Sequence, residues 1–247
     1  MSSKDIVKHY HPELDAGGFV RNCCSLAFYS RVNALLDPSF TVLDYGAGRG
    51  AQIAEEKSSY RRALITMQGK VKHVIGTDID DAVLENPYLD ERHLVEMNAP
   101  LPIADNSVDL IICDHVLEHV ADPASFVAEL RRVLKPGGWF CARTPTKNGY
   151  IGLGARVIPN KLHVKLLTKL QPTRKAEDVF PVTYRMNTLR DIRSAFRSAD
   201  WNNCTYTFSG LPGYHANSHI LFNLVRFWSW IVPKNLGAKL HIFVQKK

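Results

Sequence analysis

Residues 41–50 read Thr41-Val-Leu-Asp-Tyr-Gly-Ala-Gly-Arg-Gly50, and this stretch decides the expected fold. Its β-branched and apolar start is typical of a buried strand. Gly46, Gly48 and Gly50 follow, and they allow the backbone to turn sharply and to approach a ligand closely. A strand that runs directly into a glycine-rich turn indicates a nucleotide-type ligand site. The acid before the glycines, Asp44, bears on which ligand that is.

The spacing Gly46-x-Gly48-x-x-Ala51 also satisfies the dinucleotide fingerprint, in which a pyrophosphate binds at the N-terminus of the next helix. The carboxylate of Asp44 lies two residues before the first glycine, where it would repel a pyrophosphate. It would attract a ligand that carries positive charge. S-adenosylmethionine has an α-ammonium and a sulfonium and no phosphate. The electrostatics therefore favour this methyl donor over a nicotinamide dinucleotide, which stays as the alternative.

A second apolar run, Val74-Ile-Gly-Thr-Asp78, also ends in an acid and is followed by Ile79. An acid at this place can accept hydrogen bonds from both ribose hydroxyls, and an apolar neighbour can cover the adenine. The dinucleotide pattern puts such an acid about 20 residues after the glycines, and here the gap is longer. Asp78 could instead cap a helix that starts near Asp80. After the glycine turn, ligand binding is the favoured interpretation.

Two further segments complete a pattern: Leu101-Pro-Ile-Ala-Asp-Asn-Ser-Val-Asp-Leu-Ile-Ile-Cys113 and Leu134-Lys-Pro-Gly-Gly-Trp-Phe140. With these four segments in order, the chain resembles the class I S-adenosylmethionine-dependent methyltransferases. It is similar to their small-molecule type, which includes enzymes of ubiquinone, menaquinone, polysaccharide and lipid pathways. The resemblance covers approximately Ser39 to Pro145.

The resemblance implies an α/β fold: a Rossmann-like, doubly wound seven-stranded sheet, mostly parallel, with an antiparallel last strand and an insertion after the fifth strand. We expect one methyltransferase domain over residues 1–247, with its core in 38–145 and 187–247. The alternation of apolar runs predicts strands and helices along the chain. The strands are expected near 41–44, 72–78, 93–97, 108–113, 138–144, 201–208 and 241–245, and the helices near 19–36, 50–66, 80–86, 123–134 and 187–199.

The resemblance also implies a set of cofactor contacts. Asp44 would meet the methionine ammonium, Asp78 would hold the ribose, and Ile79 would pack on the adenine. Asn98 stands where the family usually has an acid for the adenine amino group, and it would accept through its amide oxygen. The two residues after the fourth strand would border the sulfonium. The expected cofactor-binding residues are Asp44, Gly46, Ala47, Gly48, Gly50, Asp78, Ile79, Asn98, Asp114 and His115.

Residues 115–119 spell the inverted zinc-protease motif H-x-x-E-H. That motif needs a long helix, whereas the preceding strand and Pro123 leave only about one helical turn of 3.6 residues. The ubiquinone-pathway O-methyltransferases carry a metal-associated Glu-x-x-Glu-His here, but this chain has His115 in place of the first Glu. We expect no metal, with Glu118 and His119 as the weaker alternative. A structural or base role is expected for His119.

Residues 146–186 form the expected insertion and are rich in Lys, Arg, Pro and aromatic residues. Because open α/β sheets bind ligands outside the carboxyl ends of their strands, this segment would lie over the substrate mouth. Tyr150, Tyr184 and Arg185 are the expected substrate contacts, and His163 is a second candidate for the catalytic base.

These features predict methyl transfer from S-adenosylmethionine by in-line displacement. The expected acceptor is a small molecule: a hydroxyl of a sugar, lipid or phenol, or an activated carbon. A base such as His119 or His163 would take the proton of a hydroxyl. An NAD-dependent oxidoreductase and a non-catalytic S-adenosylmethionine-binding protein are the alternatives. No nucleic acid partner is expected, because no Asn/Asp-Pro-Pro-aromatic motif follows the fourth strand.

The cysteine pattern and the first residues predict a cytoplasmic protein, and the resemblance implies an enzyme of biosynthesis. The five cysteines show no C-x-x-C spacing, and the first residues lack the apolar core of a signal peptide. Residues 217–233 include a 13-residue apolar run, Ile220 to Val232, which is shorter than the roughly 20 residues needed to span a bilayer. A buried helix is the first interpretation of this run. A peripheral membrane helix or a dimer contact is the second.

Overall fold

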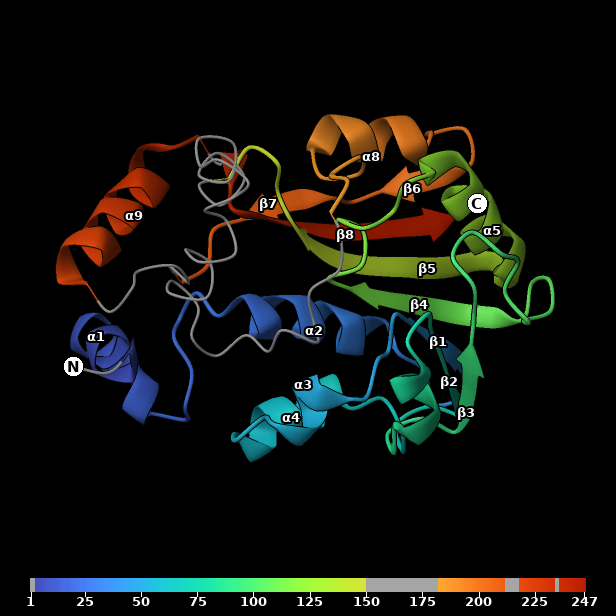
Figure 1. Cartoon of the computed structure of the whole chain (residues 1–247), viewed down its shortest axis with the longest axis horizontal. Helices are drawn as coiled ribbons and strands as arrows, with labels where there is room; N and C mark the ends of the chain where they lie inside the picture. The colour runs from blue at the N-terminus through green and yellow to red at the C-terminus, as the bar shows by residue number, and fades with distance from the viewer. Residues whose placement is uncertain (1–2, 150–181, 212–217, 234–235) are drawn as a thin grey trace.

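The computed structural model describes residues 3–149, 182–211, 218–233 and 236–247, and within them eight strands form one sheet (Figure 1). The strands are β1 (Thr41–Tyr45), β2 (His73–Asp78), β3 (Glu91–Leu94), β4 (Val108–Asp114), β5 (Leu134–Pro145), β6 (Trp201–Asn203), β7 (Tyr206–Phe208) and β8 (Lys239–Lys246). Their order is β3-β2-β1-β4-β5-β8-β6, and β7 also pairs with β8.

The first five strands are parallel, and β8 is antiparallel to β5. The strand order reverses between β1 and β4, where Val42 pairs with Leu110 and Asp44 with Ile112. In open α/β sheets, ligands bind at such a reversal, outside the carboxyl ends of the strands. The fold therefore places the glycine turn at the expected ligand crevice.

The prediction of seven strands is corrected to eight, because the predicted strand at 201–208 is divided into β6 and β7. Both pieces pair antiparallel with β8. Between them, the Asn203 side chain accepts a hydrogen bond from the Thr205 amide at 3.0 Å. This local turn interrupts the ladder, a frequent effect of Asn side chains. The predicted antiparallel pairing of this edge is confirmed.

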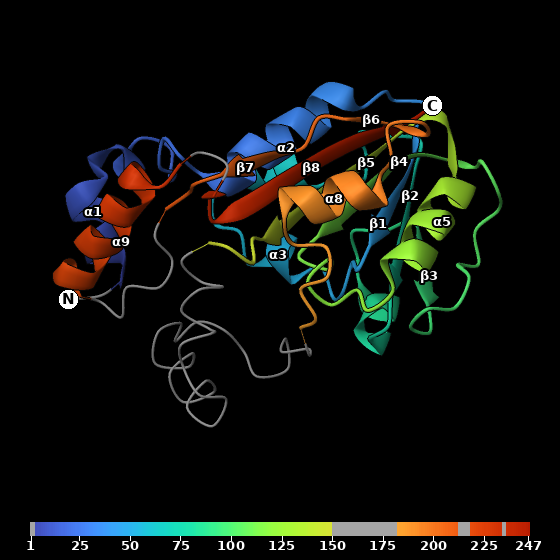
Figure 2. The same ribbon diagram turned by 90° about the horizontal axis from the view of Figure 1, so that it is seen from above.

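Helices cover both faces of the sheet (Figure 2). On one face lie α2 (Cys24–Leu35), α4 (Ser59–Ile65) and the short α3 (Ala51–Ala54); on the other lie α5 (Pro123–Val133) and α8 (Leu189–Ala195). Successive residues of each strand point alternately to the two helical layers. Leu43, Ile111 and Phe140 face α5 and α8, whereas Val42 and Leu110 face α2 and α4. The doubly wound α/β prediction is confirmed.

Two predicted helices differ in detail. The one expected at 50–66 is divided into α3 and α4, because Ser58 caps a new helix by accepting from the Arg61 amide at 3.4 Å. The segment after β2 is a 3₁₀ helix, η2 (Asp81–Glu85), which Asp80 caps. β5 starts earlier than expected, with a register irregularity between Val108 and Leu110.

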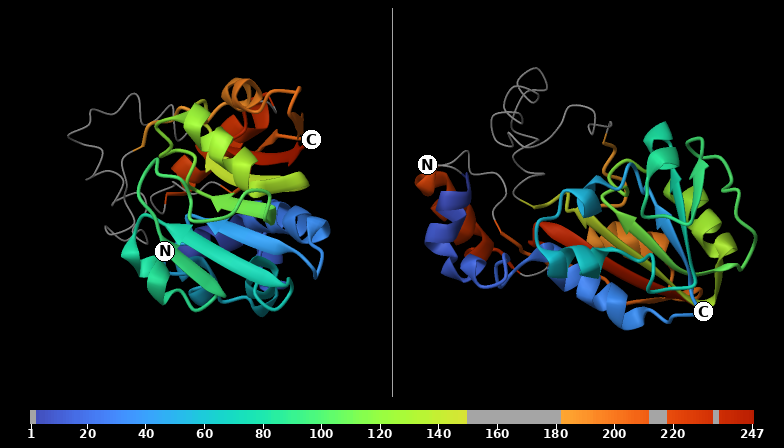
Figure 3. Two further views of the ribbon diagram at one scale, coloured as in Figure 1. Left: turned by 90° about the vertical axis from the view of Figure 1, so that its right-hand side faces the viewer. Right: turned by 90° about the horizontal axis from the view of Figure 1, so that it is seen from below.

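A helix pair lies at one end of the molecule, apart from the sheet layers (Figure 3). It consists of α1 (Ser3–Tyr10), followed by η1 (Pro12–Asp15), and α9 (His219–Ile231). The buried-helix interpretation of the apolar run is wrong, because Phe222 is the one residue of α9 that is buried. No helix among the described residues has the length and apolar character to cross a membrane.

Candidate cofactor and acceptor site

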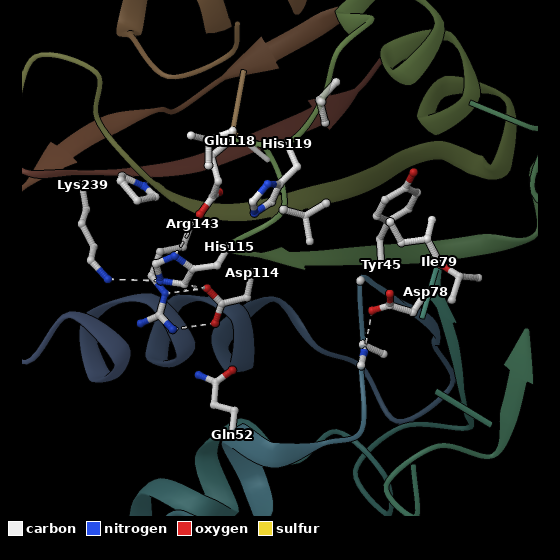
Figure 4. Close-up of a pocket in the computed structure, with 18 of the residues that line it drawn as sticks. Tyr45, Gln52, Asp78, Ile79, Asp114, His115, Glu118, His119, Arg143 and Lys239 are labelled. Atoms are coloured by element: carbon white, nitrogen blue, oxygen red, sulfur yellow. Dashed lines mark hydrogen bonds and ion pairs between the residues drawn. The ribbon is translucent and has the colours of Figure 1, made fainter. Parts of the chain in front are cut away.

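A cavity of about 1470 Å³ opens at the carboxyl ends of the parallel strands (Figure 4). Most of the predicted site residues that the structure describes line it. They are Gly46, Ala47, Gly48, Gly50, Asp78, Ile79, Asn98, Asp114, His115, Glu118, His119 and Tyr184. Asp44 and Arg185 are not in this lining, and Tyr150 and His163 lie outside the described residues.

The glycine turn adopts a backbone that other residues would disfavour. Gly46 and Gly50 have φ of +80° and +74°, in the left-handed region. A Cβ on Gly46 would lie 2.2 Å from Val116 Cγ2, and one on Gly50 would lie 2.7 Å from Asn86 Oδ1. The Asn86 amide donates to the carbonyls of Ala47 and Gly48 and holds the turn in place. The turn is therefore a preformed, tightly packed wall of the cavity.

Asp78 is bound by backbone groups and keeps capacity for a ligand. Its Oδ2 accepts from the Gly48 amide at 2.7 Å, and its Oδ1 accepts from the Asp80 amide at 2.9 Å. Each carboxylate oxygen has a second lone pair, which can accept a hydroxyl. Ile79 and Met97 expose 43% and 61% of their surface and line the cavity nearby. The carboxylate can therefore accept from ribose hydroxyls, and the exposed apolar side chains beside it can pack on the attached adenine.

Asp44 lies behind the glycine turn, where it lines a smaller adjoining cavity of about 70 Å³ together with Tyr29 and Asp114. Burial, with repulsion from Asp114 and Asp78, raises the pKa of Asp44 to about 7. Among the described residues, no hydrogen bond to its carboxylate is found. Such a group is stabilised in its charged form by a cation. Asp44 therefore lines the smaller cavity and not the main one. That it meets the cofactor ammonium stays a prediction.

Asp114, at the end of β4, forms a buried ion pair with Arg143 of β5. Arg143 Nε donates to Asp114 Oδ1 at 2.8 Å, and its Nη2 donates to the other oxygen. Arg143 Nη1 also donates to Ser25 at 2.8 Å, and Tyr29 donates to Asp114 at 3.1 Å. Despite burial, the guanidinium holds the pKa of Asp114 well below its usual range. The carboxylate is thus satisfied by protein groups on the cavity wall.

A chain of polar side chains continues from this pair across the cavity wall. Lys239 Nζ donates to His115 Nε2 at 3.1 Å, and His115 Nδ1 lies 3.4 Å from Glu118 Oε1. Glu118 in turn accepts from Thr144 at 2.8 Å. An ammonium can only donate, so His115 Nε2 is the acceptor and Nδ1 carries the proton. Burial and Lys239 lower the pKa of His115, which keeps the imidazole neutral.

Residues 117–119 form a turn rather than a helix, with the His119 amide bonded to the Val116 carbonyl at 2.8 Å. The helical geometry of a zinc protease is therefore absent at this motif. Across the described part of the chain, no group of three or more His, Cys, Asp and Glu side chains is arranged to hold a metal. Glu118 is engaged by His115 and Thr144.

Comparisons with known proteins agree with this geometry. Residues 43–142 match the family described as "Methyltransferase domain". A probable S-adenosylmethionine-dependent methyltransferase of Mycolicibacterium smegmatis is 42% identical over 81 residues, which cover 31% of each chain. A ubiquinone biosynthesis O-methyltransferase of Nitrosomonas europaea is 30% identical over 142 residues, covering 50% of this chain and 54% of that protein.

Over residues 43–142, this chain is therefore similar to S-adenosylmethionine-dependent methyltransferases. The matched family and this relative imply S-adenosylmethionine as the cofactor of the region. The matched region spans about half or less of the length of these curated relatives. Among solved structures, the [4+2]-cyclase SpnF is 16% identical with a TM-score of 0.54, covering 89% of this chain and 80% of that one. That likeness shows the fold alone.

The sequence analysis missed Arg143, Lys239 and Cys24, which line the cavity, and Asn86 and His241, which contact lining residues. The last two form a pair, with Cys24 Sγ 3.1 Å from His241 Nε2, and Cys24 lines the cavity. Burial and the nearby cations lower the pKa of His241 to about 3. Arg143 follows the apolar run Trp139 to Ala142, and nothing local in the sequence marks it as a site residue.

Asp44 predicts a pH dependence of cofactor binding. Because its pKa in the free protein is raised to about 7, a cation bound next to it must favour the ionised form. Affinity for S-adenosylmethionine should therefore fall as the pH falls, by about tenfold between pH of about 8 and about 6. Titration calorimetry over this range measures it.

The matched variants are Asp44→Asn and, as a control, Asp15→Asn, whose carboxylate is exposed. Asp44→Asn should bind more weakly and lose the pH dependence, whereas Asp15→Asn should behave as the wild type. An unchanged pH profile in Asp44→Asn would contradict the assignment.

Breaking the Asp114–Arg143 pair should lower the free energy of unfolding strongly, and a second substitution should restore part of it. Arg143→Met leaves a buried carboxylate without its partner and should lower the free energy of unfolding by about 3–5 kcal/mol. The double variant Arg143→Met/Asp114→Asn removes the unpaired charge and should regain part of this loss. Urea unfolding of both variants measures the difference. Equal stability of the single and double variants would show that the unpaired Asp114 charge is not the cause of the loss of stability.

Proposed function

We propose that the protein transfers the methyl group of S-adenosylmethionine to a hydroxyl of a small-molecule acceptor. One observation carries the proposal: the same cavity is lined by Asp78 and Ile79 beside the glycine turn and by the His115 imidazole across from them. In Figure 4, Asp78 and Ile79 lie on one side, and Lys239, His115, Arg143 and Asp114 lie on the other. The cofactor supplies an electrophilic methyl on a sulfonium. The protein supplies binding, orientation and a proton acceptor.

The residues present fit this cofactor better than a nicotinamide dinucleotide. Asp44 and Asp78 would hold the ammonium and the ribose, with the glycine turn beside them. Asp44 lies close enough to Asp78 and Asp114 for their charges to raise its pKa. A pyrophosphate placed at this turn would meet that negative field, whereas an ammonium relieves it.

His115 is the proton acceptor we favour. Its Nε2 is unprotonated and accepts from Lys239, so an acceptor hydroxyl would take the place of the Lys239 ammonium at this lone pair, and its Nδ1–H points to Glu118. Glu118 orients the ring and would stabilise the imidazolium after it takes the proton from an acceptor hydroxyl. His119, the residue first predicted for this role, also lines the cavity and is the internal alternative. Tyr184 also lines the cavity and is the candidate for a contact with the methyl acceptor.

The experiment is incubation of the protein with S-adenosylmethionine deuterated at its methyl group and with cell extract, followed by mass spectrometry. We expect a new deuterium-labelled product, absent when Asp78→Asn replaces the wild type. In parallel, S-adenosylmethionine and not NAD should raise the unfolding temperature. Binding without any labelled product would favour a non-catalytic binding protein, and stabilisation by NAD alone would favour the oxidoreductase.

The proposed base predicts opposite shifts of the pH–rate profile in two variants. Lys239 lowers and Glu118 raises the pKa of His115. Lys239→Met should therefore move the acidic limb of kcat to higher pH, and Glu118→Gln should move it to lower pH. His115→Asn should reduce kcat by about 10²-fold or more. His119→Asn is the matched control, and a loss confined to that variant would assign the role to His119.

A further inference from the structure

Three buried polar side chains, Asn187, Thr144 and Glu118, lead to the His115 ring, and we call these three residues the relay. Asn187 and Thr144 are fully buried, and Glu118 exposes 7% of its surface. Asn187 Nδ2 donates to the Thr144 hydroxyl at 2.8 Å, and that hydroxyl donates to Glu118 Oε2 at 2.8 Å. Glu118 Oε1 lies 3.4 Å from His115 Nδ1 (Figure 4).

The direction of each hydrogen bond in the relay follows from donor chemistry. The Asn187 amide faces the Pro145 carbonyl at 2.9 Å, and a carbonyl only accepts, so the NH₂ group of the amide points this way. The same NH₂ group reaches the Thr144 oxygen, which therefore accepts from it. The hydroxyl of Thr144 has one proton, and this proton remains for Glu118.

Glu118 extends this direction to His115. Burial raises the pKa of the Glu118 carboxyl, but interactions with His115, a backbone group and Thr144 more than offset burial and hold the pKa below its usual value. An ionised carboxylate only accepts, so the His115 nitrogen that faces it carries the proton. The relay therefore favours the tautomer with Nε2 unprotonated, whether or not Lys239 is bonded to that nitrogen.

Main-chain bonds fix both ends of the relay. The Glu118 carbonyl accepts from the Thr183 amide at 2.7 Å and from the Tyr184 amide at 3.1 Å. The Asn187 carbonyl accepts from the Lys147 amide at 2.9 Å. Residues 183–187 thus join the turn that carries Glu118 to the chain that follows β5, and this limits movement of the carboxylate.

A base on the cavity wall needs this tautomer. With the proton on Nε2, the His115 ring would present a donor to the cavity and could not take a proton from a hydroxyl there. Asp114 Oδ1 lies 3.8 Å from Nε2 and favours that unproductive form. Lys239 opposes it while it donates to Nε2, but its ammonium must leave before a hydroxyl can bind. The relay then remains to oppose Asp114.

We propose that Thr144 and Asn187 are positioning residues, which act through Glu118 to keep His115 Nε2 unprotonated after Lys239 has moved away. The proposal rests on the role of His115 proposed above. Neither Thr144 nor Asn187 lines the cavity, so their action on the reaction is indirect.

The experiment is NMR spectroscopy of the full chain with ¹⁵N in its histidine rings, at a pH of about 8, where neutral imidazole predominates. The spectra separate protonated from unprotonated ring nitrogens, and the signals that His115→Asn removes belong to His115. We expect the Nδ1–H form in the wild type and in Lys239→Met. Thr144→Val should move the tautomer ratio toward Nε2–H by at least about tenfold, because a hydrogen bond to a charged group is lost.

Three further variants control this measurement. Thr144→Ser keeps a hydroxyl and should restore the wild-type spectrum. Asn187→Leu leaves the Thr144 hydroxyl in place and should give a smaller shift in the same direction. Thr146→Val is the matched control, because it removes a buried hydroxyl that donates to the Gly237 carbonyl at 2.7 Å, outside the relay. It should lose similar stability and keep the wild-type tautomer.

Two results would overturn the proposal: an Nε2–H form in the wild type, or an unchanged Nδ1–H form in Thr144→Val and Asn187→Leu. A shift in Lys239→Met as large as that in Thr144→Val would overturn it too, by making Lys239 the residue that sets the tautomer. If Thr144→Val does not fold, Asn187→Leu decides. The measurement needs neither cofactor nor methyl acceptor, so its failure would leave the methyl-transfer proposal standing.

Discussion

Negative charge at the carboxyl edge of the sheet is the constraint on which the rest of the site depends. Parallel strands β2 and β4 end in Asp78 and Asp114, Asp44 is the penultimate residue of β1, and the sheet brings these ends together. Three carboxylates this close cannot all remain charged without compensation. The structure compensates each one differently.

Asp114 is neutralised by Arg143, a guanidinium that is itself 3% exposed and packed against Phe28 and Tyr29. Asp78 is held by two backbone N–H groups. Asp44 has neither kind of partner among the described residues, and the pKa of its carboxyl rises accordingly. The uncompensated carboxylate is the one that needs a cation from outside the chain. The selectivity of the crevice thus follows from which acid the protein leaves unpaired.

The sequence predicted the features that are encoded locally. The strand, the glycine turn and the acid at its start are adjacent in the chain, so one segment specifies them together. Arg143 and Lys239 were missed because their partners are far away in sequence: Lys239 lies 124 positions from His115. Arg143 follows the apolar run Trp139 to Ala142 of β5, and Lys239 is the first residue of β8, so neither position carries a local sign of a ligand site. The predicted strand at 201–208 was divided by a single Asn203 side-chain bond, which strand propensity does not register.

Helix α9 illustrates a different limit of sequence reasoning. Nine of its 13 residues are apolar, and an apolar run of this length is typical of a buried helix. Whether it is buried depends on what packs around it, and here that is mainly Tyr10 of α1 against Phe222. The sequence could limit its length and therefore exclude a span of the bilayer, but not its exposure.

The cations on the acceptor side of the cavity explain how an imidazole stays neutral among so many acids. Asp114 alone would favour protonation of His115, but Arg143 pairs with that carboxylate, and Lys239 donates directly to the ring. The neutral ring is then held with Nε2 unprotonated and bonded to Lys239, whose ammonium must move away before this nitrogen can take a proton. Glu118 acts in the opposite direction, because its carboxylate stabilises the ring once a proton has arrived. Lys239 thus favours the neutral form of His115 and Glu118 favours the protonated form. A general base needs access to both forms.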